Sequence, residues 1–447
     1  MSNLLKLQGG WLARYLQFRS TQPFPSRLPA IFPPPPPPDE EALDRQLYAK
    51  VHETGMLLGC PVVSAEMQQQ ARSLRFPEPQ GGTLFLFLET LLRLVREEEE
   101  LIQTPSHPIE VRTTWHLVQL LQYFLPESYY QLPTNVPLPE LLQNSEVLHS
   151  ALHRVEKALL EEVAIAGYSS DPRQNAFVFL HIYTFLRWQR ALRLPAGPPL
   201  AVIRQQDMQF RKELLLALIA LIWADDQITD IERQVITNYL DQSGLPFSVR
   251  REMLQHLQRP YRLELLRLER TTPILRQYLI EQMILLSLID NSQAREELEL
   301  IAGTARQLGT SEEELELIYA AVADFFSRYA SRFTFLHNNP AVRQMQEYVE
   351  ENVIKVVKLN LGRIIREIQE TRELYDLLIK AGTTPLTEEE RRRVNEQIKD
   401  ILKAIPALAL FALPGGSLLL PVVIKLLPFN ILPSSFQEAP EGAGARS

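Results

Sequence analysis

The stretch TLFLFLETLLRLV, residues 83–95, decides the fold class of this chain. Its apolar residues recur three and four positions apart, which places their side chains on one face of an α-helix. This stripe consists of Leu84, Leu88, Leu91, Leu92 and Val95. A second stripe with the same spacing consists of Leu148, Leu152, Val155 and Leu159. Both stripes predict helices that are buried on one side, so we expect an all-α protein.

Proline-rich breaks separate the predicted helices, at residues 77–82, 105–108, 133–139 and 195–199. Six consecutive prolines, Pro33–Pro38, favour an extended polyproline II spacer, with docking on an aromatic groove as the alternative. We therefore expect a disordered tail over residues 1–40, followed by a helical domain over residues 41–200.

Composition limits the function classes. The 447 residues carry a net charge of -8, which disfavours binding to nucleic acid because phosphate backbones require a basic face. Cys60 is the single cysteine in the sequence, so neither a disulfide within the chain nor a cysteine zinc site is expected. The first residues lack the apolar core of a secretory signal, which favours a cytoplasmic location.

The next informative segment is LLLALIAL, residues 214–221, followed by WADDQITDIE, residues 223–232. It resembles the TerB family of tellurite-resistance proteins, which are small helical bundles with an acidic corner. Asp225, Ile228 and Glu232 match that corner, whereas Asp226 stands where the family has a glycine. The resemblance implies a TerB-like bundle over residues 205–330, with a second corner at Asp290.

The acidic residues of this segment have two interpretations. Asp225, Asp226 and Asp290 could together hold a divalent cation through oxygen ligands. Alternatively, Thr229 and Glu232 form the two ends of a capping box, which explains the glutamate without a metal. The same box recurs at residues 311–314 and 387–390, which favours the structural interpretation.

Other groups invite chemistry less strongly. His149, His153 and Glu156 share a helical face and could ligate zinc, although an ordinary helix surface is the favoured interpretation. The run Glu97–Glu100 is interpreted as a solvated helix end rather than a calcium site, because neighbouring positions on a helix point in different directions. No nucleophile with an adjacent base and no phosphate-binding glycine loop is recognisable, so we expect a protein that is not an enzyme and has no cofactor.

Residues 340–385 are predicted to form long amphipathic helices. Their apolar stripe consists of Met345, Val349, Val353, Val356, Ile364, Ile368 and Leu378. Packing within the chain is favoured over an oligomerisation seam because the heptad spacing is not sustained. The oligomeric state stays open.

Residues 405–424 contain no charged side chain, which reaches the roughly 20 residues needed to span a bilayer as a helix. Prolines interrupt this run, so a kinked span or a re-entrant hairpin is expected rather than a straight helix. The residues that define the segment are Pro406, Pro414, Gly415, Gly416, Pro421, Lys425, Pro428 and Pro433. The alternative is a proline-turned clamp buried in a soluble core.

The order of these prolines, with the box at residues 387–390 before them, resembles the leucine zipper and EF-hand containing transmembrane protein family. The resemblance covers residues 386–436, is closer to a bacterial, biofilm-associated branch, and implies membrane association and a role in cation or proton homeostasis. Residues 437–447 are expected to be a disordered tail.

Together these features predict a non-catalytic, membrane-associated helical protein of ion or membrane homeostasis or of a stress response. The alternative is a soluble interaction scaffold for surface or biofilm-related assembly. Membrane lipid and other proteins are the expected partners. Basic residues precede the apolar run, so everything before it is expected on the cytoplasmic side of the inner membrane. They are Arg391, Arg392, Arg393, Lys399 and Lys403.

Overall fold

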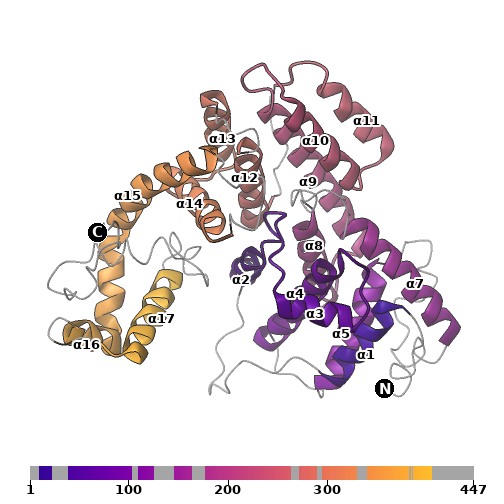
Figure 1. Ribbon diagram of the computed structural model, residues 1–447, viewed down its shortest axis with the longest axis horizontal. Coiled ribbons are helices and arrows are strands. Elements are labelled where there is room, and N and C mark those ends of the chain that lie inside the picture. Colours follow the sequence, from indigo (N-terminus) through magenta and orange to yellow (C-terminus); the bar gives the residue numbers. More distant parts are fainter. Residues whose placement is uncertain are drawn as a thin grey trace, which may run out of the picture. The chain divides into compact units, whose positions relative to one another are not determined.

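Every regular element in the described part of the chain is a helix (Figure 1). The structure is a computed structural model. It describes residues 10–22, 39–102, 109–124, 145–163, 177–262, 271–288, 294–329, 340–381, 384 and 386–404. The prediction of an all-α protein is therefore confirmed. The chain divides into two compact units, Met1–Tyr278 (unit 1) and Leu279–Ser447 (unit 2).

Unit 1 is built around one long helix, α4. The complete helices of this unit are α1 (Trp11–Thr21), α2 (Glu40–Glu53), α3 (Ala65–Ser73), α4 (Gly81–Ile102), α5 (Ile109–Phe124), α7 (Ser145–Glu162), α8 (Val178–Leu192), α9 (Leu200–Leu221), α10 (Asp230–Gln242) and α11 (Phe247–His256). Helix α4 packs against α2, α3, α5 and α8. All five members of its predicted stripe are at most 3% exposed, which confirms the buried face. Leu152, Val155 and Leu159 of the second stripe are likewise buried on α7.

Helix α1 lies inside the stretch that was expected to be a disordered tail. It packs against α5 and α7. Trp11 and Tyr15 are buried and contact Phe76, with ring centroids 4.5 and 5.9 Å apart. The tail prediction is therefore wrong for residues 11–21, because their aromatic and leucine side chains have a core to enter. Residues 23–38, which include the proline run, lie outside the described residues.

A charged cluster is buried between α2, α4 and α8. Arg190 of α8 donates to Asp44 of α2 at 2.5 Å and to both carboxylate oxygens of Glu98 of α4, at 2.6 and 3.0 Å. Glu98 is 3% exposed, so the interpretation of its acidic run as solvated is wrong there. The physical reason is helical spacing, since Glu98 follows Val95 by three residues and extends the buried stripe.

The predicted capping boxes are confirmed. At the start of α10, the Thr229 hydroxyl accepts from the Glu232 amide at 3.2 Å, and Glu232 accepts from the Thr229 amide at 2.8 Å. Ser311 and Glu314 make the same two bonds at the start of α14, at 3.1 and 2.8 Å. Each box satisfies two helix-start donors that would otherwise lack partners. The predicted limits of the TerB-like segment, residues 205–330, stay a prediction. The boundary between the two compact units falls within that segment, inside α12 (Pro273–Ser287).

Unit 2 contains one helix much longer than its neighbours. Its helices after α12 are α13 (Arg295–Gln307), α14 (Glu312–Tyr329), α15 (Pro340–Glu370), α16 (Arg372–Ala381) and α17 (Glu388–Ala404). Helix α15 packs along α14 and also against α16 and α17. From the predicted stripe, Met345, Ile364, Ile368 and Leu378 are at most 1% exposed, so these four side chains pack within the unit.

No helix among the described residues is long and apolar enough to cross a membrane. The expected membrane segment, residues 405–436, and the expected tail, residues 437–447, lie outside the described residues. The predictions for both therefore stay predictions.

Candidate functional site

A helical hairpin of α16 and α17 stands directly before the uncharged run of residues 405–424. Each helix of the hairpin turns an apolar stripe towards the other and towards α15. The buried side chains, all at most 5% exposed, are Ile364, Ile368, Leu374, Leu378, Leu386, Val394, Ile398, Ile401 and Leu402. Their spacing of three and four residues along each helix produces one continuous apolar face. The hairpin is thus a small core of its own within unit 2.

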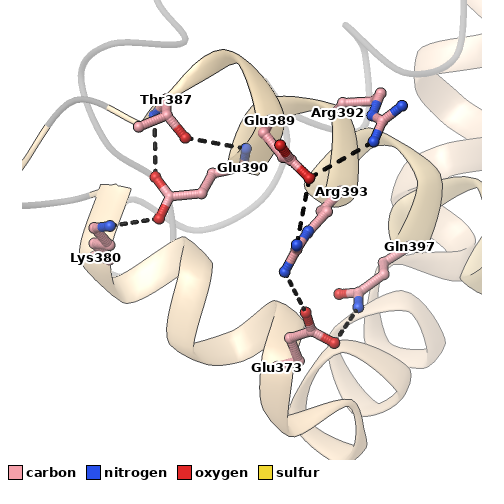
Figure 2. A network of polar contacts seen from close by, with 8 residues as sticks. All are labelled: Glu373, Lys380, Thr387, Glu389, Glu390, Arg392, Arg393 and Gln397. Atoms are coloured by element: carbon pink, nitrogen blue, oxygen red, sulfur yellow. Dashed lines mark hydrogen bonds and ion pairs between the residues drawn. The ribbon is translucent and has the colours of Figure 1, made fainter.

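The turn of the hairpin is fixed by a third capping box. Thr387 accepts from the Glu390 amide at 3.3 Å, and Glu390 accepts from the Thr387 amide at 3.0 Å. Lys380, at the end of α16, donates to the other Glu390 oxygen at 2.5 Å (Figure 2). The Lys380 hydrogen bond, followed by the Thr387 amide, holds the pKa of Glu390 below its ordinary value. One carboxylate therefore joins the end of α16 to the start of α17.

A second set of polar contacts joins the middle of the two helices. Gln397 donates to one oxygen of Glu373 at 3.0 Å, and Arg393 lies 3.6 Å from the other (Figure 2). Arg393 also pairs with Glu389 at 3.4 Å, and Glu389 lies 3.8 Å from Arg392. The charged side chains of this set are exposed, so each ion pair is weakened by water and salt. Their main effect is to set the angle and register of α17 on α16.

These contacts position α17 on α16, and we recognise no catalytic arrangement of side chains among them. Among the described residues, no group of three or more histidine, cysteine or acidic side chains could hold a metal ion. What the hairpin offers is a rigid base that ends at Ala404, the residue before the uncharged run. Arg391 is exposed on α17 and makes no ion pair with another described residue.

The two described acids of the corner after α9 make hydrogen bonds within the protein. Asp226 has a φ of 65°, a left-handed conformation, at the position where the TerB resemblance has a glycine. Arg262 donates to Asp226 at 2.5 Å and also to the Trp223 carbonyl. Asp225 accepts from the Gln227 amide at 3.0 Å, as in an Asx turn. Local hydrogen bonds thus explain both acids.

The divalent cation expected at this corner stays a prediction. Asp225 and Asp226 adjoin each other in the chain, but Asp226 is engaged by a cation already present in the protein, Arg262. Asp290, the third proposed ligand, lies outside the described residues. The structure therefore brings two of the three residues near each other and does not describe the third.

The histidine pair on α7 is described only in part. His153 is exposed, and the side chain of His149 is not described. Glu156 accepts from the Leu12 amide at 2.9 Å, at the start of α1. Because the α1 N-cap, Gly10, has no side chain, a carboxylate from a distant helix supplies the missing acceptor. The favoured interpretation as an ordinary helix fits this contact.

Sequence reasoning found the Thr387 box but missed the links between α16 and α17. Lys380 and Glu390 are ten residues apart, and Glu373 and Arg393 are twenty. No helical spacing connects such positions, since they meet only after the hairpin closes. Residues defining the membrane segment, from Pro406 to Pro433, lie outside the described residues.

Comparison with known proteins bears on this same region. The family model described as LETM1-like, RBD matches residues 386–444. The match begins at the hairpin turn and includes the whole uncharged run. It confirms the resemblance inferred for residues 386–436, whereas the TerB-like module, a bacterial origin and a link to biofilms stay predictions. No curated protein and no solved structure matches the chain.

Proposed function

We propose that this chain is a non-catalytic, membrane-associated helical protein of ion or membrane homeostasis or of a stress response. Its LETM1-like segment is the part that contacts the bilayer. The observation that carries the proposal is the overlap between the family match, residues 386–444, and the uncharged run, residues 405–424. A run of this length and composition is favourable in lipid, where each large apolar residue contributes roughly -0.3 to -0.6 kcal/mol at a helix centre.

The hairpin supports this proposal physically. A segment interrupted by prolines and glycines inserts only marginally on its own, since each freed backbone group needs a partner. The α15–α17 core ends at Ala404 and supplies a rigid attachment for such a segment. The basic residues of α17 lie just before it, and positive flanks tend to remain on the cytoplasmic side. We therefore place the helical units on that side, with a single pass or a re-entrant segment.

Fractionation of the cell tests the membrane part of the proposal. The full chain is expected to sediment with membranes after an alkaline carbonate wash, and a chain truncated after Lys403 is expected to lose that association. A full-length variant with Leu410→Arg and Leu419→Arg is expected to behave like the truncation, because each arginine at a span centre costs about 2.5–3.5 kcal/mol. The matched control is Glu441→Arg, which adds a positive charge outside the uncharged run.

Retention of the double arginine variant on membranes contradicts the proposal, as does a full chain found only in the soluble fraction. Either result favours the alternative scaffold, which recruits protein partners for surface or biofilm-related assembly. The homeostasis part is tested separately. Purified full chain in proteoliposomes is expected to change cation or proton flux relative to the double arginine variant, and equal fluxes contradict it.

A further inference from the structure

The most exposed large apolar side chain among the described residues is Phe247, at the start of α11. It is 73% exposed, and Leu254 on the same helix is 40% exposed. With about 100° of rotation per residue, Phe247, Arg251 and Leu254 fall on one face because they are four and three residues apart. Helix α11 thus carries an outward strip of two apolar side chains with an arginine between them.

This outer face belongs to a helix that is firmly held on its other side. Met253 is 1% exposed and packs inward, and α11 lies beside α10 (Figure 1). Trp223 donates to the His256 carbonyl at 2.8 Å, and Arg233 donates to the Leu257 carbonyl at 2.7 Å. The exposure of Phe247 is therefore a property of an anchored helix, whose inner face is already occupied.

The charge around this face is opposite to that of the whole chain. Residues 242–262 contain four arginines and one glutamate, in a chain whose net charge is -8. Two of these arginines pair with acids of the protein, Arg250 with Asp241 at 3.4 Å and Arg262 with Asp226 at 2.5 Å. Arg251 and Arg259 are exposed and make no ion pair with another described residue. Arg251 lies between the two apolar side chains of the strip, and Arg259 follows the end of α11.

The acid of this segment lies away from the strip. Glu252 is five residues after Phe247, which places it about 140° around the helix. An apolar tip flanked by arginine, with the acid turned away, has the composition of helices that lie in the interface of an anionic bilayer. The strip is small for a protein interface, which typically needs about 800 Å² from each partner. A bilayer surface requires no such matched shape.

We propose that the Phe247, Arg251 and Leu254 face of α11 is a second membrane contact, which rests on an anionic lipid surface. This proposal depends on the proposed function in one respect: attachment of the chain to the bilayer by the LETM1-like segment raises the local concentration of lipid at α11. Phe247 and Leu254 enter the interface, and Arg251 and Arg259 meet the headgroups.

A fluorescent probe on the full chain tests this proposal. An environment-sensitive label is attached at Phe247→Cys or, as the matched control, at Leu194→Cys, another apolar site of unit 1, which is 60% exposed. The native Cys60 is buried, and unmodified protein reports any labelling there. Vesicles contain phosphatidylcholine alone or mixed with phosphatidylglycerol, with brominated acyl chains as quenchers. We expect quenching at position 247 on mixed vesicles, weaker quenching on phosphatidylcholine, and none at position 194.

Substitutions separate the apolar and charged parts. Phe247→Ser is expected to lower affinity for mixed vesicles about tenfold, since burial of the ring is lost. Arg251→Gln with Arg259→Gln is expected to remove the preference for mixed vesicles and its sensitivity to salt.

Co-flotation with the vesicles reads out the proposed function independently. A chain that floats while the label at 247 stays unquenched overturns the α11 contact and leaves the LETM1-like contact standing. A chain that neither floats nor is quenched overturns both. A change of emission at 247 without vesicles, growing with protein concentration, shows that a second copy covers α11 and likewise overturns the lipid contact.

Discussion

The Arg190 cluster of unit 1 and the α16–α17 network of unit 2 use the same kinds of side chain in opposite surroundings. Both join helices through arginine and carboxylate groups. The side chains of Arg190 and Glu98 are 11% and 4% exposed, whereas those of Arg393 and Glu373 are 53% and 58% exposed. Water therefore screens the second pair and hardly reaches the first.

This difference in burial changes what each contact does. In the buried cluster, burial by itself lowers the pKa of Arg190. The hydrogen bonds and negative charges of Glu98 and Asp44 outweigh this effect and raise that pKa above its ordinary value. Removing the arginine there takes its hydrogen bonds and its positive charge away from two buried carboxylates. In the exposed network, water replaces any partner that is removed. Buried contacts of this kind thus fix which helices meet, while the exposed contacts adjust how α17 sits on α16.

The largest expected effect is at Arg190. Arg190→Met is expected to lower the free energy of unfolding by about 3–5 kcal/mol, since it strands buried charges. The matched control is Arg45→Met, one residue after Asp44, which removes an exposed pair with Glu41 worth about 0.3–0.5 kcal/mol. Urea unfolding followed by circular dichroism measures both. Equal losses for the two variants contradict the comparison.

A middle-sized effect is expected at the capping boxes. Thr229→Ala is expected to lower the free energy of unfolding by about 1 kcal/mol, because the Glu232 amide at the start of α10 loses its acceptor. Glu232 is only 4% exposed, so little water reaches this box. Thr387→Ala, in the exposed box of α17, is expected to cost less. Thr237→Ala is the control, since the hydroxyl of this half-buried threonine donates to the Arg233 carbonyl within its own helix and caps no helix start. Thermal melting midpoints measure these effects. A larger fall in midpoint for Thr387→Ala than for Thr229→Ala contradicts the expected order.

The smallest effects are expected to have opposite signs with pH. Burial, opposed by Arg190, raises the pKa of Asp44, so the folded state binds a proton more readily and stability falls as pH rises through that pKa. The pKa of Glu390 is lowered, chiefly by Lys380, so its contribution is present above its ordinary pKa and is lost as pH falls through the lowered value.

Unfolding midpoints between about pH 3 and pH 6 test these signs. As pH rises, the stability of the wild type is expected to fall relative to that of Asp44→Asn. Over the same range it is expected to rise relative to that of Glu390→Gln. If the stability difference between wild type and variant changes with pH in the same direction for both variants, the distinction between the buried and the exposed cluster is contradicted.

The sequence by itself determined the features that depend on neighbours within a few residues. It predicted the helical class, the buried stripe of α4 and the three capping boxes, since spacings of three and four residues decide which groups share a helix face or meet at a helix start. The order of prolines after Leu413 was equally local, and it pointed to the LETM1-like match at residues 386–444.

Only the tertiary structure decided the contacts between positions distant in the chain. Glu156 caps α1 from 144 residues away, Arg190 meets Asp44 across 146, and Arg262 holds Asp226 across 36. No periodicity links such pairs, because their meeting depends on how whole helices pack. Chain separation thus explains why the sequence did not show that Glu98, Glu156 and Asp226 are, in the described residues, partners of an arginine or a helix start.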